Sequence, residues 1–278
     1  PPMALSFVLK LLATLPLSWL HLLGSWASWC AALASASYPG KIKQNLKQSK
    51  ICDDKELTRL INLNISETGK GFFELPFIWF RPKKDVLSCV RTIHGEKYLK
   101  QVISGKTGGI FITPHLGGFE IIPVFISEFT RITSLYRPPH KRFLTAPMLE
   151  GRCGVNQSVA SADLRGVRLL FKALKKGEIV GILPDQVPKK GDGKWVDFFG
   201  RPAYTMTLVQ QLAARTKAPI VFTYAVRIKN GAGFDLFFEP IDEYQGEFNT
   251  EKMNRKIEAI VRKYPSQYLW GYNRYKRS

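Results

Sequence analysis

The order of apolar segments along the chain predicts an α/β fold, in which a mixed β-sheet is covered by helices and follows an N-terminal membrane-anchoring helix. Short apolar runs of strand length alternate with longer segments of helical periodicity, as in sheets covered by helices on both faces. Apolar residues make up 45% of the 278 residues and charged residues 23%, which is typical of a chain with a sizeable core. The most apolar stretch lies at the N-terminus, from Ala4 to Tyr38.

The N-terminal stretch favours membrane attachment. Lys10 is its single charged residue, and its length exceeds the ~20 residues that a spanning helix needs. Polar residues recur every three or four positions and form one narrow stripe along a helix, which leaves a wide apolar face. The stripe consists of Ser6, Lys10, Thr14, Ser18, His21, Ser25 and Ser28. Trp19, Trp26 and Trp29 could lie at the level of the lipid headgroups, and Pro16 is expected to kink the helix.

A cleavable signal peptide and a buried core helix are the competing interpretations of this stretch. A signal peptide would have a shorter apolar region and a small-residue cleavage site, for which the chain offers only Ala34-Ser-Ala36. The sequence leaves open whether the helix spans the membrane or lies flat on it. Four lysines follow directly and predict that the body of the protein lies on the cytoplasmic side: Lys41, Lys43, Lys47 and Lys50. We therefore expect an anchor over residues 1–38 and a globular domain over residues 39–278.

Periodicity and turn residues predict the remaining elements in order. Helices are expected over Asp53–Phe80, Glu96–Ser104, Phe119–Phe129, Leu164–Lys176, Thr205–Thr216 and Thr250–Tyr264. Strands are expected over Val86–Ile93, Ile110–Thr113, Ile132–Tyr136, Ile179–Leu183, Pro219–Ile228 and Phe234–Phe238. Arg81-Pro82 ends the first of these helices, and Gly177 ends the fourth as a C-cap. The Pro-, Gly- and Lys-containing segment Val187–Lys194 is expected to be a mobile surface loop that could cover a ligand site.

The charge balance indicates an anionic partner. The chain carries 41 Lys and Arg against 22 Asp and Glu, a net charge of +19, which suits lipid headgroups, nucleic acid or an acidic protein. No basic recognition helix, ribonucleoprotein pattern or zinc-finger spacing supports nucleic acid. The four cysteines form no CxxC pair, so the sequence predicts no metal site. Cys153 follows an arginine and could be an activated thiolate, but an inert small residue is the favoured interpretation.

His115 and Glu120 are the candidate catalytic residues. His115 follows the strand Ile110–Thr113, and ligands bind at the carboxyl ends of strands in α/β sheets. Five residues separate the two side chains, so they can meet only if the backbone bends, for which Gly117 and Gly118 supply the freedom. A carboxylate that orients a histidine makes a general base, and with no protein nucleophile nearby a substrate hydroxyl would attack. The alternative is a histidine that caps the next helix and a glutamate in solvent.

The segment around His115 resembles the His-x4-Asp/Glu motif of the glycerolipid and lipid A acyltransferase superfamily. The similarity is closest to the lipid A secondary acyltransferases of the lauroyl and myristoyl type. Further blocks agree in the same order: Tyr136-Arg-Pro138, Glu150-Gly-Arg-Cys-Gly154, Arg165-Gly-Val-Arg-Leu-Leu170, Leu183-Pro-Asp-Gln186, Phe198-Phe-Gly-Arg-Pro-Ala203, Ala214-Arg-Thr-Lys-Ala-Pro219 and Gln267-Tyr-Leu-Trp-Gly-Tyr-Asn-Arg-Tyr-Lys276. In the last block Tyr272 and Asn273 stand where the family usually has His and Arg. The resemblance covers nearly the whole chain and implies a glycerolipid acyltransferase-like fold.

The resemblance also implies a reaction and its partners. A fatty acyl group would pass from acyl carrier protein to a hydroxyl of a lipid A precursor, without a cofactor, at the cytoplasmic face of the bacterial inner membrane. His115 would deprotonate the hydroxyl, Glu120 would orient His115, and residues 39–278 would form the acyltransferase catalytic domain. The sequence gives neither the length of the acyl chain nor the acceptor position.

Five further residues are candidates for substrate binding. Arg152 would hold the acceptor or the developing oxyanion. Arg137, Arg165 and Arg168 could bind phosphates, with a solvated basic face as their alternative. Asp185 follows the strand Ile179–Leu183 at another ligand-facing edge, and its alternative is a turn or cap residue.

Two other functions stay open at this point. The first is an acyltransferase that uses acyl-CoA and acts on another glycolipid or a lysophospholipid. The second is a basic protein that binds membrane surfaces without catalysis.

Overall fold

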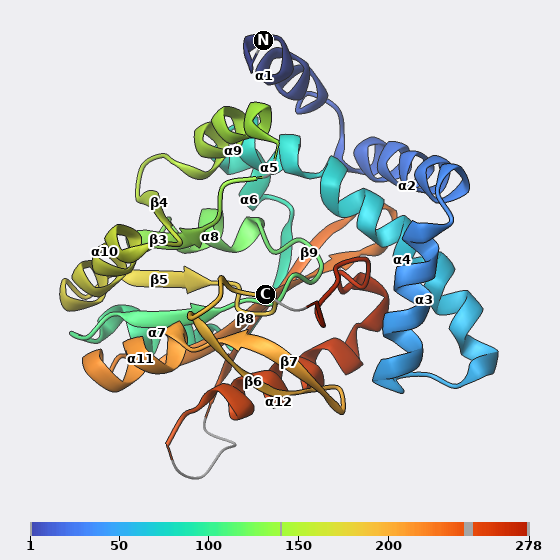
Figure 1. The fold of residues 1–278 in the computed structure, drawn as a ribbon. Coiled ribbons are helices and arrows are strands. Elements are labelled where there is room, and N and C mark those ends of the chain that lie inside the picture. The colour runs from blue at the N-terminus through green and yellow to red at the C-terminus, as the bar shows by residue number, and fades with distance from the viewer. Residues whose placement is uncertain (1, 140, 242–246, 277–278) are drawn as a thin grey trace.

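A seven-stranded sheet forms the centre of the computed structural model, which describes residues 2–139, 141–241 and 247–276 (Figure 1). Its strands are β1 (Val90–His94), β2 (Gly109–Ile112), β3 (Ile132–Tyr136), β4 (Gln157–Ser161), β5 (Ile179–Ile182), β8 (Ile220–Ile228) and β9 (Gly233–Pro240). Their order is β1-β9-β8-β2-β5-β3-β4, and every neighbouring pair is parallel except the antiparallel β8 and β9. The predicted mixed sheet is confirmed. A separate antiparallel hairpin joins β6 (Gly193–Phe198) to β7 (Arg201–Met206).

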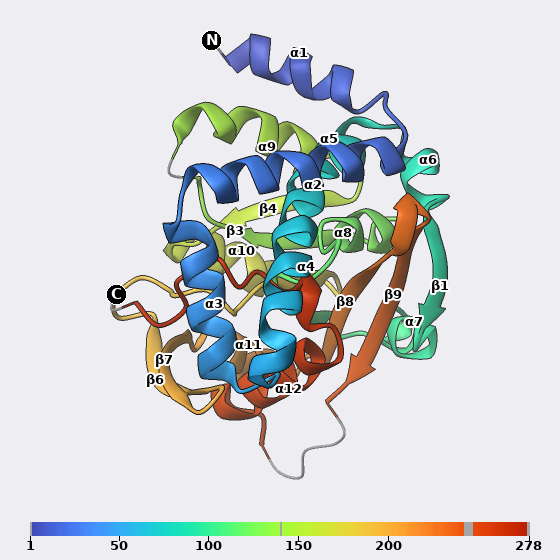
Figure 2. The same ribbon diagram turned by 90° about the vertical axis from the view of Figure 1, so that its right-hand side faces the viewer.

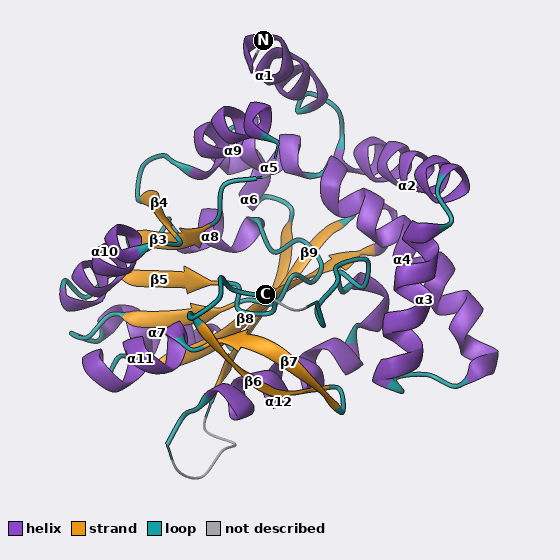
Figure 3. Cartoon of the chain, viewed as in Figure 1, coloured by secondary structure: helices purple, strands orange, loops and turns teal. Residues whose placement is uncertain are grey.

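Helices cover both faces of this sheet (Figure 3). In chain order they are α1 (Pro2–Leu12), α2 (Leu17–Ala34), α3 (Ser37–Ser49), α4 (Asp54–Phe73), α5 (Leu75–Phe80), α6 (Lys83–Leu87), α7 (Glu96–Ser104), α8 (Ile121–Ile126), α9 (Thr145–Arg152), α10 (Leu164–Lys175), α11 (Leu208–Thr216) and α12 (Thr250–Lys263). Short 3-10 turns lie at Arg142–Leu144, Lys229–Gly231 and Pro265–Gln267.

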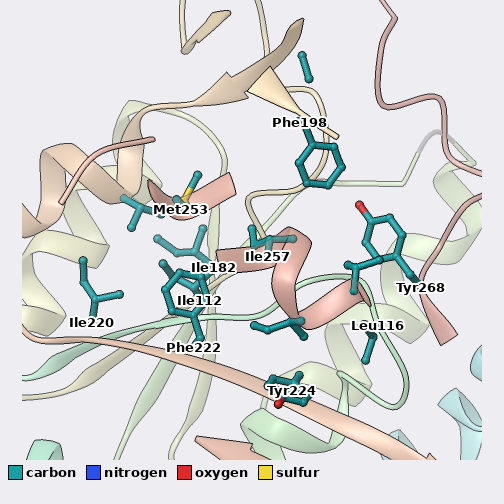
Figure 4. Close-up of a cluster of buried hydrophobic side chains, with 14 of the residues drawn as sticks. Ile112, Leu116, Ile182, Phe198, Ile220, Phe222, Tyr224, Met253, Ile257 and Tyr268 are labelled. Carbon is teal, nitrogen blue, oxygen red and sulfur yellow. The ribbon is translucent and has the colours of Figure 1, made fainter. Parts of the chain in front are cut away.

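The sheet separates two hydrophobic clusters, because neighbouring residues of a strand point to opposite faces. One cluster joins the sheet to α3, α4, α10, α11 and α12. Figure 4 shows its centre, where Ile112, Ile182 and Phe222 of the sheet pack beside Ile257 of α12. The other cluster joins the opposite face to α2, α5, α7 and α8. The apolar strand residues Ile110, Phe111 and Ile112 therefore serve both clusters in alternation.

The single N-terminal helix that the sequence predicts over residues 4–38 is divided into α1 and α2, and α3 begins at its end, at Ser37. Pro16 stands directly before α2, as its N-cap, so the predicted kink is a complete break. A proline cannot donate the backbone hydrogen bond that would continue α1. No helix in residues 2–139, 141–241 and 247–276 is both long and apolar enough to cross a membrane.

Part of the polar stripe of α2 faces the protein. His21 and Ser28 are buried, as is Gly24 between them, and His21 Nε2 lies 3.0 Å from Glu74 Oε2, whereas Ser18 is exposed. A side chain on Gly24 would collide with the backbone of Gly69 in α4, so the two helices touch along their backbones. The division of the chain at residue 38 stays a prediction, but these contacts argue that α2 belongs to the folded body.

The opposite side of α2 carries large apolar residues into solvent. Trp19, Leu22, Trp26 and Leu33 are 59%, 65%, 68% and 83% exposed. Their spacing places them along one side of the helix. In α1, Phe7 and Leu11 are also exposed. Figure 2 shows both helices along the upper edge of the molecule, with α9 next to them.

Several predicted boundaries shift in the structure. The helix expected over Asp53–Phe80 is two helices, divided at Glu74. The strand expected from Val86 begins at Val90, after α6, and the helix expected over Phe119–Phe129 is limited to α8. The β6–β7 hairpin, α9 and β4 have no counterpart in the prediction, because their short runs of mixed polarity give no clear period.

Candidate active site

A cavity of about 610 Å³ opens at the carboxyl ends of β2, β3 and β5. His115 lies in its wall, three residues beyond the end of β2. On one face of the sheet the cavity extends beneath α8, past Phe111, Ile122 and Gly181. On the other face it reaches Val167 of α10 and Leu208 of α11. His115 therefore stands where two differently lined arms of the cavity join at the sheet edge.

Asp185 holds His115 through two hydrogen bonds. The ring nitrogen Nδ1 of His115 lies 2.7 Å from Asp185 Oδ1, and the backbone N–H of His115 donates to Asp185 Oδ2 at 2.8 Å. An ionised carboxylate can only accept, so Nδ1 carries the proton and Nε2 is left with its lone pair. Backbone and ring are thus fixed by one side chain from the turn after β5.

Gln186 is the partner of the other ring nitrogen. Its amide nitrogen Nε2 lies 3.2 Å from His115 Nε2, and with the tautomer set by Asp185 the amide donates to that lone pair. Both residues line the cavity, so Nε2 is the nitrogen that a substrate can reach. A substrate hydroxyl that replaced the Gln186 amide as the hydrogen-bond partner of His115 Nε2 would donate its proton towards that nitrogen.

The C-terminal segment fixes the backbone of the histidine loop. The N–H of Leu269 donates to the carbonyl of His115, and the N–H of Gly117 donates to the carbonyl of Gln267, each at 3.0 Å. The Tyr272 hydroxyl accepts from the N–H of Val187 at 3.0 Å, which ties the same segment to the turn after Asp185. The C-terminal block, residues 267–276, therefore holds the backbone segments that carry His115 and Val187.

Asp185 is sealed from the cavity. Its side chain is only 1% exposed, and Tyr268 and Arg274 are buried nearby. Burial alone would raise the pKa of the Asp185 carboxyl, but the charge and hydrogen bonds of His115 outweigh burial and hold that pKa below its ordinary value. Burial, followed by the Asp185 charge, raises the pKa of Tyr268 well above its usual range. Asp185 consequently stays ionised and Tyr268 stays neutral at physiological pH.

Glu120 has partners other than His115. Arg152 binds it through two nitrogens, with Nε donating to Oε2 at 3.0 Å and Nη2 donating to Oε1. The indole N–H of Trp79 donates to Oε2 at 3.1 Å. Burial would lower the pKa of Arg152, but the Glu120 charge and hydrogen bond outweigh it and hold that pKa above its ordinary value. Glu120, Arg152 and Trp79 together line the cavity beside His115.

This arrangement corrects the predicted pairing of His115 with Glu120. The backbone does bend as expected, with Gly117 at φ 57°, but the bend presses Gly117 against β8, where a side chain would collide with the carbonyl of Ala225. Glu120 is thereby directed towards α9 and away from the histidine ring. Asp185, expected at the substrate, is instead the carboxylate hydrogen-bonded to the His115 ring.

The remaining predicted residues are separated by the fold. Arg137 lines the cavity and donates to the carbonyl of Val187 at 3.3 Å. Arg165 and Arg168 are exposed on α10 and are not among the described residues that line the cavity. Cys153 is exposed directly after α9.

The described part of the chain contains no group of three or more His, Cys, Asp or Glu side chains that could hold a metal ion. The site contains a histidine whose Nε2 faces the cavity, together with an arginine and an amide as hydrogen-bond donors. Such a set can remove a proton from a hydroxyl and stabilise an oxyanion that forms next to it.

Gln186, Trp79 and Tyr268 are parts of the site that sequence reasoning did not single out. Gln186 and Tyr268 lie in blocks that carry the family resemblance, so those blocks were the available signal. Trp79 lies inside an apolar run and has no local mark of function.

The chain has recognisable relatives among known proteins. A family model described as bacterial lipid A biosynthesis acyltransferase matches residues 3–277. A lipid A biosynthesis lauroyltransferase of Escherichia coli strain K12 is 26% identical over 231 residues, which cover 80% of this chain and 74% of the relative. A lipid A biosynthesis palmitoleoyltransferase of the same strain is 26% identical over 227 residues, which cover 80% and 73%. A lipid A biosynthesis acyltransferase of Haemophilus influenzae is 24% identical over 230 residues, which cover 80% and 72%.

Proposed function

The chain belongs to the bacterial lipid A biosynthesis acyltransferase family and is an O-acyltransferase, and from this premise we propose that His115, oriented by Asp185, is its general base. The acceptor is a hydroxyl of a lipid A precursor, and acyl carrier protein delivers the acyl chain. The observation that carries the proposal is the His115–Asp185 pair with Nε2 at the cavity wall. Family membership removes the non-catalytic alternative, a basic protein that only binds membranes.

The reaction needs one proton transfer in each direction. The acceptor hydroxyl gives its proton to His115 Nε2 while its oxygen bonds to the carbonyl carbon of the acyl thioester. The tetrahedral intermediate then expels the thiolate, which takes the proton back from Nε2 and leaves as a free thiol. Asp185 stabilises the imidazolium between these two steps and holds the ring in one orientation. No acyl group is attached to the protein at any stage.

Two side chains are available to stabilise the negative charge on the carbonyl oxygen. Arg152 uses Nε and Nη2 for Glu120, so Nη1 can donate to a substrate oxygen. Gln186 is already within hydrogen-bond distance of the histidine that takes the proton. In this scheme Glu120 keeps Arg152 in place beside the reacting carbonyl, and its effect on the histidine is indirect.

The exposed apolar side of α1 and α2 suits a lipid acceptor. α1 packs beside α9, where Lys10 forms an ion pair with Glu150 at 2.6 Å, and α9 carries the cavity residues Met148 and Arg152. We infer that α1 and α2 lie flat in the surface of the inner membrane, on its cytoplasmic face. The mouth of the cavity then lies near the headgroup region, where the acceptor resides. The excess of positive charge favours both anionic lipid and an acidic carrier protein.

The test is acyl transfer by the purified full chain, with acyl carrier protein as donor and a lipid A precursor as acceptor, measured by mass spectrometry of the lipid product. His115→Ala should lower kcat by ~10²–10⁴ because the general base is removed. The thermal unfolding temperature should fall, because loss of the ring removes one hydrogen bond from the buried Asp185 carboxylate, so circular dichroism is used to check that the variant is folded at the assay temperature.

Cys153→Ala is the matched control, because this exposed cysteine lies just after α9 and the scheme gives it no step. It should retain the activity of the unmodified chain. Turnover by His115→Ala at the unmodified rate would contradict the general-base assignment. A labelled acyl group trapped on Cys153 would replace direct transfer with a two-step reaction.

A further inference from the structure

Gly181 lies in the middle of the cavity arm beneath α8. It belongs to β5, where its neighbours across the sheet are Phe111 of β2 and Ser134 of β3. All three residues line the cavity. Two residues back along β5 is Ile179, which pairs with Ile132 of β3. Rows of a sheet that face the same way are roughly 6.6 Å apart, so Gly181 lies one row above the apolar row that closes the arm.

The backbone does not require a glycine at this position. Gly181 is not among the residues with positive φ, and its strand pairs regularly on both sides. Glycine in the interior of a strand is unfavourable because it loses more conformational freedom and packs no side chain. The other residues of β5 are Ile179, Val180 and Ile182, which all pack into the core. The reason for glycine here must lie in the space above it.

The space above Gly181 is part of the cavity. A Cβ at this position would meet Ser134 Oγ at 3.3 Å and Ile132 Cδ1 at 3.5 Å, with nothing else in closer contact. A methyl group therefore fits after a small movement of the serine hydroxyl, whereas a larger side chain would fill the arm from wall to wall. The walls here are mostly apolar, with Ile122 and Val124 of α8 opposite the strand. Ser134 is a polar lining residue at the depth of Gly181, and the polar Gln157, which pairs with Ile132, lies one row deeper.

The shape and chemistry of this arm suit a linear alkyl chain. The arm begins at His115, passes the row of Leu183 and Tyr136, reaches Gly181 and ends at Ile132, a depth of roughly 13 Å along the strands. An acyl thioester with its carbonyl at His115 Nε2 would send its chain down this arm. The other arm, at Val167 and Leu208, has a wider polar border that includes Asp163, Lys189 and Asp192.

We propose that the arm beneath α8 holds the acyl chain of the donor and that Gly181, by lacking a side chain, sets the longest chain that fits. Any side chain at position 181 shortens the arm by about one row of the sheet. The inference rests on the proposed function, because it takes the acyl thioester as the substrate at His115.

The experiment measures kcat/KM for a series of saturated acyl carrier protein donors of increasing chain length. Gly181→Ala and Gly181→Val should shift the preference to shorter chains, with valine giving the larger shift. The ratio of kcat/KM between the longest accepted donor and a donor shorter by a few carbons should fall by about tenfold or more, since one methylene in an apolar pocket changes discrimination by that factor. Ile132→Ala should shift the preference the other way, because it deepens the closed end.

Val167→Phe is the control, because it adds bulk to the other arm of the same cavity. It should leave the ranking of donor lengths as it is in the unmodified chain. The assignment would be overturned if Gly181→Ala and Gly181→Val kept the ranking of donor lengths, or if they lowered kcat/KM by the same factor for every donor. If only Val167→Phe shifted the preferred donor length, the acyl chain would be assigned to the other arm.

A binding measurement separates this inference from the proposed function. Saturated fatty acids of the same lengths are titrated into the unmodified chain and into Gly181→Val, and heat release is recorded. Selective weakening of the long fatty acids supports the length-setting role even if no donor is turned over. Equal affinities of the two proteins for every fatty acid would overturn the length-setting role. The proposed function would still stand in that case if the unmodified protein transfers acyl groups.

Discussion

Asp185 makes the contacts that fix His115 in the wall of the cavity. Its two carboxylate oxygens bind the backbone N–H and the ring Nδ1 of the same residue. Because the carboxylate is buried and its pKa is held low, the negative charge persists through the physiological range. The sequence motif favours Glu120 for this role, but both of its carboxylate oxygens accept hydrogen bonds from Arg152 and Trp79.

The two carboxylates can be distinguished by isosteric amides. Asp185→Asn should lower kcat by ~10²–10⁴ with little change in KM, because an amide can present the wrong hydrogen-bonding group to Nδ1 and favour the wrong tautomer. Glu120→Gln weakens the hold on Arg152, so KM for the acceptor should rise while the pH profile of kcat keeps its shape. Steady-state kinetics over a range of pH give all of these quantities.

Unfolding temperatures of both variants serve as the control, because a buried charge network contributes to stability as well as to function. The alternative assignment predicts the reverse result. If Asp185→Asn kept a normal kcat while Glu120→Gln lost it at unchanged KM, Glu120 would be the residue that positions the histidine.

Among the elements, α2 carries apolar residues on both its buried and its exposed side. Leu17 and Leu20 pack into the core, and His21, buried beside them, is bound to Glu74, which in turn is bound to Arg227 at 2.8 Å. Its exposed side carries Trp19, Leu22 and Trp26. Large apolar side chains gathered on one exposed side mark a surface that contacts another apolar phase. The exposed apolar side of α2 supports the proposal that this helix lies against a lipid surface.

Removal of this apolar side should weaken attachment without loss of the fold. The double variant Trp19→Ser, Trp26→Ser should bind vesicles of mixed anionic and neutral phospholipid at least about tenfold more weakly, since burial of a single large apolar side chain is worth ~1.5–3 kcal/mol. Both side chains are exposed, so the unfolding temperature should change little. Vesicle flotation at moderate salt gives the bound fraction.

A matched control replaces two exposed aromatic residues elsewhere, Phe129 and Trp195, which are 46% and 52% exposed. The double variant Phe129→Ser, Trp195→Ser should bind vesicles as the unmodified chain does. Equal binding by the Trp19→Ser, Trp26→Ser variant would show that α2 does not face the lipid.

For the whole molecule, net charge and fold act at different ranges. The cavity recognises the reacting groups at contact distance, whereas a charge of +19 acts on any acidic partner before contact. Acyl carrier protein is small and acidic, and acyl-CoA concentrates its charge on one nucleotide. Long-range attraction should therefore distinguish the two donors through the rate of encounter.

A salt titration tests this distinction. With one acyl chain on both carriers, kcat/KM for acyl carrier protein should exceed that for acyl-CoA at low salt and should fall by about tenfold on moving to physiological ionic strength, where the Debye length is ~8 Å. The value for acyl-CoA should fall less. The assay is run in detergent so that membrane binding does not contribute.

Equal or better use of acyl-CoA at every salt concentration would contradict the donor assignment. It would favour the alternative enzyme, which takes acyl-CoA and acts on another glycolipid or a lysophospholipid. His115→Ala is the control for both donors, because the chemical step is the same with either carrier.

The sequence by itself determined the α/β class, most strands of the sheet, the position of His115 and the family resemblance. These features are local: strand periodicity, a histidine after a buried strand and ordered blocks can be recognised without knowledge of what they touch. It also indicated the wide apolar side of the N-terminal segment and predicted a kink at Pro16, where the structure has a complete break.

Only the tertiary structure decided which carboxylate meets His115. Asp185 lies 70 residues from His115 along the chain, and the two come together because β2 and β5 are neighbours in the sheet. Glu120 is near in sequence but the bend at Gly117 turns it towards Arg152. The position of Gly181 also depends on strand neighbours. It lines the cavity between Phe111 of β2 and Ser134 of β3, which are far from it in the sequence. Contacts across a sheet depend on which strands are neighbours, and the strand order brings together residues that are far apart in the sequence.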